Sequence, residues 1–386
     1  MTFPTTAFSR KARQRWGKEV FVTLFSRVVQ QCVEAGLVGG HKIHVDSSLV
    51  DANAALSSVK PLSPELVRAI EQTAREQLHK LDEPERQDGP PEQPPSGSGG
   101  ASSVGKFSKA NRQFRSTTDP DATLVRQGGL KSRPRYKSHR AVDDQQAIIT
   151  AVQTTTGAVD EGSCLKSLIE AHEDITAQSV RTAIADARYG SVTNLVACQK
   201  AGIRPHLKLL GESHKGKGRS AGIYPEERFV YQPQTNTYLC PAGQLMRPRR
   251  LHPERLVWEY VTAKGTCLAC HLRAFCTRSR SGRTIVRHRD QSWLDKARRI
   301  AHSAAARADL QRRQHLIERS FADAANNHGF KRARWRALWK QAIQDLLIAT
   351  VQNLRKLVRH WSETDLELLA LIRLFLETKP LSFCKT

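Results

Sequence analysis

Three carboxylates stand at positions where they could do metal-dependent chemistry on phosphodiesters. Asp46 follows the alternating apolar residues of segment 43–45, and Asp186 follows the apolar run 180–185. The carboxyl ends of neighbouring strands meet in one crevice of an open α/β sheet, so we expect these two side chains to be neighbours. Glu318 lies beside the apolar face of a predicted helix, close enough to face the same crevice. The ordinary alternative is that each acid caps a strand or pairs with a cation.

Convergence of these acids would call for a cation. Three neighbouring carboxylates repel one another and raise one another's pKa unless a positive charge neutralises them. Hard oxygen ligands suit Mg²⁺ or Mn²⁺. Two such ions, bridged by Asp46 and Asp186 with Glu318 completing one of the two sites, can activate a water or a 3′-hydroxyl and stabilise the leaving oxygen of a phosphodiester.

Four of the eight cysteines form a second candidate metal site. They are spaced C-x26-C-x2-C-x5-C, and they are Cys240, Cys267, Cys270 and Cys276. A C-x2-C pair with two further cysteines nearby is typical of a tetrahedral, structural Zn²⁺ site. The alternative is four reduced cysteines without a metal. The others are interpreted as buried or incidental thiols, namely Cys32, Cys164, Cys198 and Cys384.

The charge of the chain favours a polyanionic partner. The 386 residues hold 61 Lys+Arg and 37 Asp+Glu, a net charge of 61 − 37 = +24, with a pI near 10.1. No run of apolar residues is long enough for a membrane span, and the first residues lack a signal-peptide pattern. Membrane, secreted and collagenous classes are therefore excluded. Double-stranded DNA is the favoured partner, because basic blocks bind phosphate backbones by counterion release.

Two of the three basic blocks supply the candidate DNA-binding residues. These are Lys131, Arg133, Arg135, Lys137, Arg140, Lys331, Arg332, Arg334, Arg336 and Lys340. We expect Arg332, Arg336 and Lys340 to lie on one exposed helical face. A third block, residues 276–299, carries eight basic residues and two acids. Solvated surfaces and local ion pairs, for example with Asp345, are the alternatives.

The elements that must position these residues follow from apolar periodicity and turn signals. Helix 16–37 has an apolar stripe of Val20, Leu24, Val28 and Cys32. Then we predict a strand at 42–47, a helix at 64–81, a hairpin of 136–142 and 147–154 around Asp143-Asp144, a helix at 165–172, a strand at 180–185, a helix at 193–201, a strand at 205–210, and long helices at 292–325 and 334–360. Residues 89–105, of which 13 of 17 are Gly, Pro or Ser, have the composition of a tether. This order resembles an α/β, ribonuclease H-like mixed sheet flanked by helices.

Several motifs, in order, resemble those of bacterial insertion-sequence transposases of the DDE type. The resemblance covers residues 16–360. It is carried by His-Val-Asp46-Ser-Ser-Leu-Val-Asp51-Ala-Asn53-Ala, Ser116-Thr-Thr-Asp119-Pro-Asp121-Ala, Tyr136-Lys-Ser-His139-Arg-Ala-Val-Asp143-Asp, Ala185-Asp186-Ala-Arg-Tyr189-Gly190, the cysteine stretch, Ile317-Glu318-Arg-Ser-Phe321-Ala-Asp323, and His328-Gly-Phe-Lys331-Arg-Ala-Arg334-Trp335-Arg336. Gln314 and Ala325 stand where many relatives have Arg and Lys.

The resemblance implies a ribonuclease H-like catalytic domain with Asp46, Asp186 and Glu318 as its metal-binding triad. It also implies a division of the chain. The expected parts are 1–40, the remnant of an N-terminal helical DNA-binding domain that is otherwise missing; 41–60, the first catalytic strand; 61–117, a helix and the Pro/Gly/Ser-rich insert; 118–211, the core; 212–290, an inserted zinc-finger-like subdomain; 291–361, the C-terminal helices; and 362–386, a tail.

The resemblance further implies strand cleavage at insertion-sequence ends and transfer into target DNA. The expected cofactors are two Mg²⁺ or Mn²⁺ ions and a structural Zn²⁺. The expected partner is double-stranded DNA, bound by a homodimer in the bacterial cytoplasm at the nucleoid, with no membrane. Two alternatives stay open: a truncated, non-catalytic zinc-stabilised protein that competes for element ends, and a ribonuclease H-like nuclease without strand joining.

Overall fold

The computed structural model describes residues 16–65, 68, 72, 108–129, 131–210 and 221–361. Most of the predicted helix 64–81, the whole predicted tether 89–105, the predicted tail 362–386 and Cys384 lie outside these ranges, so those predictions stay untested.

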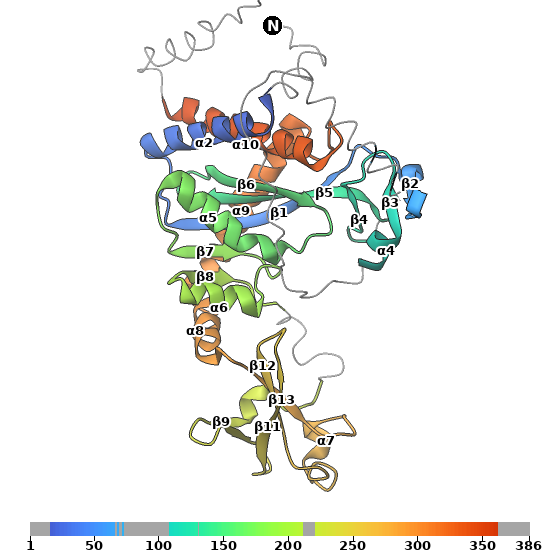
Figure 1. The fold of residues 1–386 in the computed structure, drawn as a ribbon. Helices are drawn as coiled ribbons and strands as arrows, with labels where there is room; N and C mark the ends of the chain where they lie inside the picture. The colour runs from blue at the N-terminus through green and yellow to red at the C-terminus, as the bar shows by residue number, and fades with distance from the viewer. Residues whose placement is uncertain are drawn as a thin grey trace, which may run out of the picture.

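A mixed six-stranded sheet forms the centre of the molecule (Figure 1). Its order is β4-β5-β1-β7-β8, and β6 pairs with β5. The strands are β1 (Lys42–Asp51), β4 (Thr123–Val125), β5 (Arg133–Asp143), β6 (Ile149–Thr156), β7 (Thr182–Ala185) and β8 (Arg204–Leu207). β5 runs antiparallel to β1, β4 and β6, whereas β7 runs parallel to β1 and β8. This mixed sheet with its helices is consistent with the ribonuclease H-like fold predicted from the sequence.

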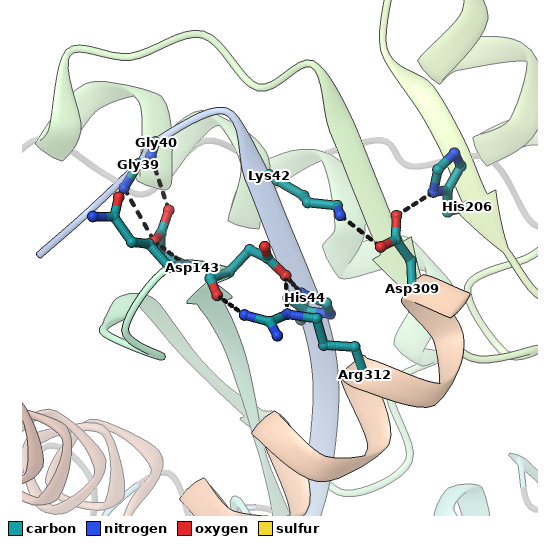
Figure 2. Close-up of polar contacts among 10 residues, drawn as sticks. Gly39, Gly40, Lys42, His44, Asp143, His206, Asp309 and Arg312 are labelled. Carbon is teal, nitrogen blue, oxygen red and sulfur yellow. Dashed lines mark hydrogen bonds and ion pairs between the residues drawn. The ribbon is translucent and has the colours of Figure 1, made fainter. Parts of the chain in front are cut away.

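The turn of the β5–β6 hairpin lies where the sequence predicts it, around Asp143-Asp144. The Asp143 carboxylate accepts hydrogen bonds from the backbone N–H groups of Gly39 and Gly40, at 3.1 and 2.8 Å (Figure 2). Gly40 has a positive φ of 74°, a conformation that a residue with a Cβ rarely adopts. These contacts fix the chain at the point where it enters β1.

Helices cover both faces of the sheet. One face packs against α5 (Leu165–Thr176), α6 (Val192–Lys200) and α8 (Gln291–Ala301). The other face packs against α9 (Ala304–His328) and α10 (Leu338–His360), with α2 (Glu19–Glu34) lying along α10 (Figure 1). Two apolar cores therefore form, one on each side of the sheet.

Short elements and a separate two-stranded sheet connect the central strands and helices. A 3-10 helix, η1 (Leu56–Ser58), precedes β2 (Val59–Pro61), which pairs with β3 (Phe114–Ser116), and α4 (Ser108–Gln113) leads into β3. Another 3-10 helix, η2 (Glu161–Cys164), leads into α5.

A separate five-stranded antiparallel sheet lies between β8 and α8 in the chain. Its order is β13-β12-β11-β10-β9. The elements of this region are η5 (Glu226–Arg228), β9 (Val230–Gln232), β10 (Thr237–Leu239), β11 (Leu245–His252), β12 (Val257–Val261), α7 (Arg273–Cys276) and β13 (Thr284–His288). It has its own apolar cluster, which comprises Phe229, Tyr238, Met246, Tyr260 and Ile285.

The helices differ from their predictions in three respects. In α2 the buried stripe contains Phe21 and Phe25, whereas the predicted Val20 and Leu24 are 46% and 44% exposed. Both sets are apolar with the same spacing, and the larger aromatic surfaces are the ones buried. The predicted helix 292–325 is two helices, because Ser303 caps a new one by accepting the N–H of Ala306.

The predicted helix 334–360 starts four residues late, at Leu338. Ala337 has a positive φ of 81°, which is incompatible with a helix that continues through it. The residues before it pair with the end of β1: Asp51 donates its N–H to the Lys331 carbonyl and accepts the N–H of Ala333. This extended pairing satisfies backbone groups that a helix would otherwise have satisfied.

Arg140, on β5, is fully buried and joins the sheet to both long helices. Its Nη1 donates to Ser320 Oγ of α9 and to Gln352 Oε1 of α10, each at 2.9 Å. Its guanidinium also lies over the rings of Phe321 and Phe330, at 4.7 and 5.0 Å from their centroids. Burial lowers the pKa of Arg140 to about 10, and the nearby acids Asp345 and Asp323 oppose that shift.

Replacing this guanidinium should destabilise the fold. We expect Arg140→Met to lower the free energy of unfolding by about 3 kcal/mol, because Asp345, Ser320 and Gln352 lose a buried partner. Urea titration followed by circular dichroism measures the change. Arg133→Met, at an exposed position of the same strand, is the control and should change stability by about 0.5 kcal/mol or less. Equal stability of the two variants would contradict the central role of Arg140.

Candidate metal site and nucleic-acid interface

The register of β1 and β7 places Asp46 beside Asp186. The last pair between these parallel strands is Val45 with Ala185, and both side chains pack into the core on the α5 side of the sheet. The next residue of each chain is the aspartate, and successive side chains of a strand alternate between faces. The sequence prediction that these two carboxylates are neighbours is therefore borne out by their placement.

Glu161, which the sequence analysis did not select, is the third acid of this site. Oxygens of Asp46, Glu161 and Asp186 all lie within 4.8 Å of one another. Glu161 comes from η2, which packs tightly against the loop after β7. Asn194 holds these two segments together by donating from Nδ2 to the carbonyls of Gly162 and Tyr189, at 2.8 and 2.9 Å.

Three cations compensate the three acids. Arg313 Nη1 lies 2.6 Å from Asp46 Oδ2, and Lys137 Nζ lies 3.1 Å from Glu161 Oε1. Arg188 Nη1 lies 3.6 Å from the same oxygen of Glu161. The acids thus form a half-buried cluster whose charge is balanced by protein side chains.

Burial dominates the titration of Asp46. Its pKa is raised, first by burial and then by repulsion from Asp186, whereas Arg313 and the N–H of Ser47 oppose the shift. The Ser47 N–H donates to Asp46 Oδ1 at 2.7 Å. The raised pKa indicates that Arg313 alone does not fully stabilise the ionised carboxylate of Asp46, and that additional positive charge would stabilise it further.

Helix α9 holds Arg313 against β1 through two polar clusters (Figure 2). In one, Asp309 of α9 accepts from Lys42 Nζ at 2.5 Å and contacts His206 Nδ1 at 2.6 Å. In the other, Arg312 donates from Nε to the Asp144 carboxylate at 2.7 Å. The same carboxylate oxygen lies 2.7 Å from Nε2 of the fully buried His44. These contacts connect α9 to β1, β8 and the hairpin turn, all within about one helical turn of Arg313.

Glu318 lies on the same helix but outside the acidic group. It is exposed, and it follows Arg313 by five residues, which places it about 140° around the helix and about 7.5 Å along its axis. The described residues therefore bring Asp46 and Asp186 together with Glu161, and leave Glu318 on the flank of α9. Its role stays a prediction.

The four selected cysteines line one small pocket. Cys240, Cys267, Cys270 and Cys276 are among the residues that line a cavity of ≈ 20 Å³, but no three of their Sγ atoms all lie within 4.8 Å of one another. Burial raises the pKa of Cys276, and the other three thiols raise it further while Arg283 lowers it. The N–H of Gln244 points at Cys240 Sγ from 3.3 Å. The sulfur-rich lining fits a soft-ligand metal such as Zn²⁺.

The first basic block is mostly internal, which corrects the prediction for three of its residues. Arg135, Lys137 and Arg140 are 3%, 5% and 0% exposed. Arg135 pairs with Asp51 at 2.6 Å and Lys137 with Glu161 at 3.1 Å, while Arg140 donates to side chains of α9 and α10. Because these charges are buried, they cannot contact a DNA backbone. Lys131 and Arg133 are exposed.

The second basic block lies beside the carboxylate site, but it does not form the predicted helical face. Arg332 and Arg336 precede α10, so they do not share a helical stripe with Lys340. Lys331 Nζ donates to Ser48 Oγ at 2.8 Å, two residues from Asp46 on β1. Arg336 Nε donates to the Asn53 carbonyl at 3.2 Å. Arg332, Arg334 and Arg336 are exposed, and Lys340 is half-buried over Trp339.

One comparison with known proteins gives a match. Residues 239–358 match the family model of a transposase DDE domain. The match spans the cysteines, Glu318 and the second basic block, and it supports a DDE-type transposase. No curated protein and no solved structure matches the chain. In the part of the chain that the structure describes, no helix is long and apolar enough to cross a membrane.

Removing the guanidinium beside Asp46 should strengthen divalent-ion binding. We expect Arg313→Gln to bind Mn²⁺ about tenfold more tightly, because a competing charge 2.6 Å from Asp46 is lost. Isothermal titration calorimetry of the purified protein measures the affinity. Arg307→Gln, which changes an exposed arginine near the start of the same helix, is the control and should leave the affinity within about twofold. Weaker Mn²⁺ binding by Arg313→Gln would instead show that Arg313 holds the ligand in place.

Proposed function

We propose that this DDE-type protein cleaves the ends of an insertion sequence and transfers the freed strands into target DNA. The observation that carries the proposal is the placement of Asp46 beside Asp186 in a ribonuclease H-like sheet. Residues 239–358 match a transposase DDE domain, and this match supports the interpretation of the two carboxylates as catalytic metal ligands. Bacterial DNA at the nucleoid would be the substrate.

The donor set fits Mg²⁺ or Mn²⁺. Carboxylate oxygens from three chain segments lie within 4.8 Å of one another, and Asp46 has a raised pKa that additional positive charge would reverse. When bound, such ions activate an attacking water or 3′-hydroxyl and stabilise the leaving oxygen. Asp46 and Asp186 would hold them. The protein itself supplies positioning and charge rather than a general base.

The third ligand has two candidates. Glu161 is favoured by geometry, because its oxygens already lie beside those of Asp46 and Asp186. Glu318 is favoured by its motif and by its place in the matched segment, on the helix that carries Arg313. We propose that Glu318 completes the catalytic triad and that Glu161 with Lys137 supports the site from the α5 side.

DNA would approach over the exposed basic residues near the carboxylates. Lys331 reaches Ser48 on β1, and the exposed Arg332, Arg334 and Arg336 follow it in the chain. Such residues can follow phosphates without reading bases. Joining two element ends requires two active sites, so we keep the prediction that a homodimer assembles on DNA.

Carboxamide variants test the metal-binding residues. Asp46→Asn, Asp186→Asn and Glu318→Gln should each reduce strand cleavage and joining by at least about 100-fold, because each removes a ligand charge but keeps the side-chain shape. The substrate is a duplex from the DNA that flanks the gene, incubated with a supercoiled target plasmid in Mg²⁺ or Mn²⁺. DNA affinity should be unchanged or higher, since negative charge near the backbone is lost.

Glu161→Gln distinguishes the two candidates for the third ligand. If Glu318 is the ligand, Glu161→Gln retains joining within about tenfold, whereas Glu318→Gln does not. The reverse result would assign the third ligand to Glu161. A dideoxy-terminated donor strand is the control for joining, because it lacks the attacking hydroxyl. Cleavage without joining by the wild-type protein would identify a nuclease and contradict the transposase proposal.

We also propose that the four-cysteine pocket holds one structural Zn²⁺. Protein purified under reducing conditions should contain about one zinc per chain, and Cys267→Ser/Cys270→Ser should lose it, because two of four ligands are gone. Elemental analysis by mass spectrometry measures the metal. Cys198→Ala removes a buried thiol of the main core and should retain zinc. Wild-type protein without zinc would contradict this proposal.

A further inference from the structure

A basic cleft of ≈ 520 Å³ lies between α9, α10 and the turn of the β5–β6 hairpin. Its lining includes five basic side chains and one acid, Asp323. The basic residues are Arg319, Arg355, Lys356, Arg359 and His360. This excess of positive charge in a concave site strengthens the local electrostatic potential and attracts anions.

The single acid of the cleft is already satisfied. Asp323 accepts hydrogen bonds from Gln352 and Asn327, each at 2.7 Å, and pairs with Arg355 at 3.0 Å. Burial raises the pKa of Asp323, but its hydrogen bonds and cations outweigh this, and the pKa is lowered. Asp323 therefore neutralises Arg355 and leaves the other cations uncompensated. Arg319 and Arg359 are exposed and have no side-chain partner among the described residues.

One further cation, Arg140, lies behind the surface of the cleft, and Lys356 of the lining is itself partly buried. Arg140 is fully buried and bonds to Ser320 and Gln352, which both line the cleft. Lys356 donates from Nζ to the carbonyl of Ala147. Burial lowers the pKa of Lys356 to about 8, and Arg140 and Arg359 lower it further, against the influence of Asp323 and Cys32. An anion in the cleft would relieve this repulsion.

The cleft is distinct from the carboxylate site. Arg319 follows Arg313 by six residues, so it lies about 240° around α9 from Arg313, which is about 120° by the shorter way, and about 100° from Glu318. Substrate bound at Asp46 and an anion in the cleft would therefore occupy different sides of one helix. A duplex that passes over α9 could contact both, whereas a small metabolite could not.

We propose that this cleft binds a phosphate group of the DNA backbone, with Arg319 and Arg359 as its main contacts. The inference rests on the proposed function, because that function supplies the DNA. Inorganic phosphate presents the same anionic oxygens to these arginines, so it would bind at the same place. The contact fixes the position of the duplex relative to α9 and carries no base specificity.

The first experiment tests the cleft without DNA. The thermal unfolding midpoint is measured with inorganic phosphate and with chloride at equal ionic strength. Phosphate should raise the midpoint of the wild type by several degrees, because it binds only the folded state. Arg319→Gln/Arg359→Gln should lose this shift. Arg280→Gln/Arg299→Gln removes two exposed arginines elsewhere and should retain it, as should Asp186→Asn, which changes only the carboxylate site.

The second experiment identifies the source of the phosphate. Binding of a labelled duplex is measured from 50 to 200 mM NaCl. Arg319→Gln/Arg359→Gln should decrease the slope of log K against log salt by about one counterion, equally for unrelated sequences. A lost phosphate shift with an unchanged DNA slope would overturn the DNA assignment in favour of free phosphate. If the Arg319→Gln/Arg359→Gln variant matched the Arg280/Arg299 control in both measurements, the proposal that the cleft binds phosphate would be wrong. Neither readout depends on catalysis, so loss of strand joining alone leaves this result intact.

Discussion

The structure must hold two aspartates side by side at a partly buried site. The register of β1 and β7 makes this unavoidable, because the last residue pair of the two strands is followed by Asp46 on one and Asp186 on the other. Their repulsion, and the burial that raises the pKa of Asp46, must be offset in the folded protein. Arg313, Lys137 and Arg188 do so from α9, β5 and the loop after β7. Cations from three separate segments of the chain thus offset the negative charge of one site.

Helix α9 connects this site to the rest of the molecule. Near its start, Asp309 and Arg312 attach it to β1, β8 and the hairpin turn (Figure 2). Arg313 therefore meets Asp46 with little freedom. Further along, Ser320 and Phe321 pack around the buried guanidinium of Arg140. One flank of the helix then carries Glu318, and the other lines the basic cleft. On the proposed function, a helix with such fixed anchors would couple the position of bound DNA to the carboxylates, because its two flanks cannot move independently.

The sequence predicts features that depend on nearby residues and misses those that depend on distant ones. Asp46, Asp186 and the Asp143-Asp144 turn were predictable, since each follows an apolar run whose strand character is local. Glu161 was not, because an acid before a helix resembles any favourable N-terminal charge until η2 packs beside β7. In α2, two apolar stripes differ by one residue, and only the partner helix decides that Phe21 and Phe25 are buried. The placement of Arg140 in a core is equally nonlocal, because a cation in a strand usually faces water.

The basic residues that give the chain its net charge of +24 fall into two groups. Some cations are internal partners: Arg135 pairs with Asp51, and Lys137 and Arg313 neutralise the carboxylates. Only the remaining, exposed cations are available to a backbone. We propose that a divalent ion bound at the carboxylates would neutralise Asp46 and release Arg313 from its ion pair, two residues along β1 from the contact of Lys331 with Ser48. A phosphate would bind more favourably there after this exchange. Since linkage is reciprocal, DNA at this surface should in turn favour the divalent ion, which couples substrate binding to assembly of the catalytic site.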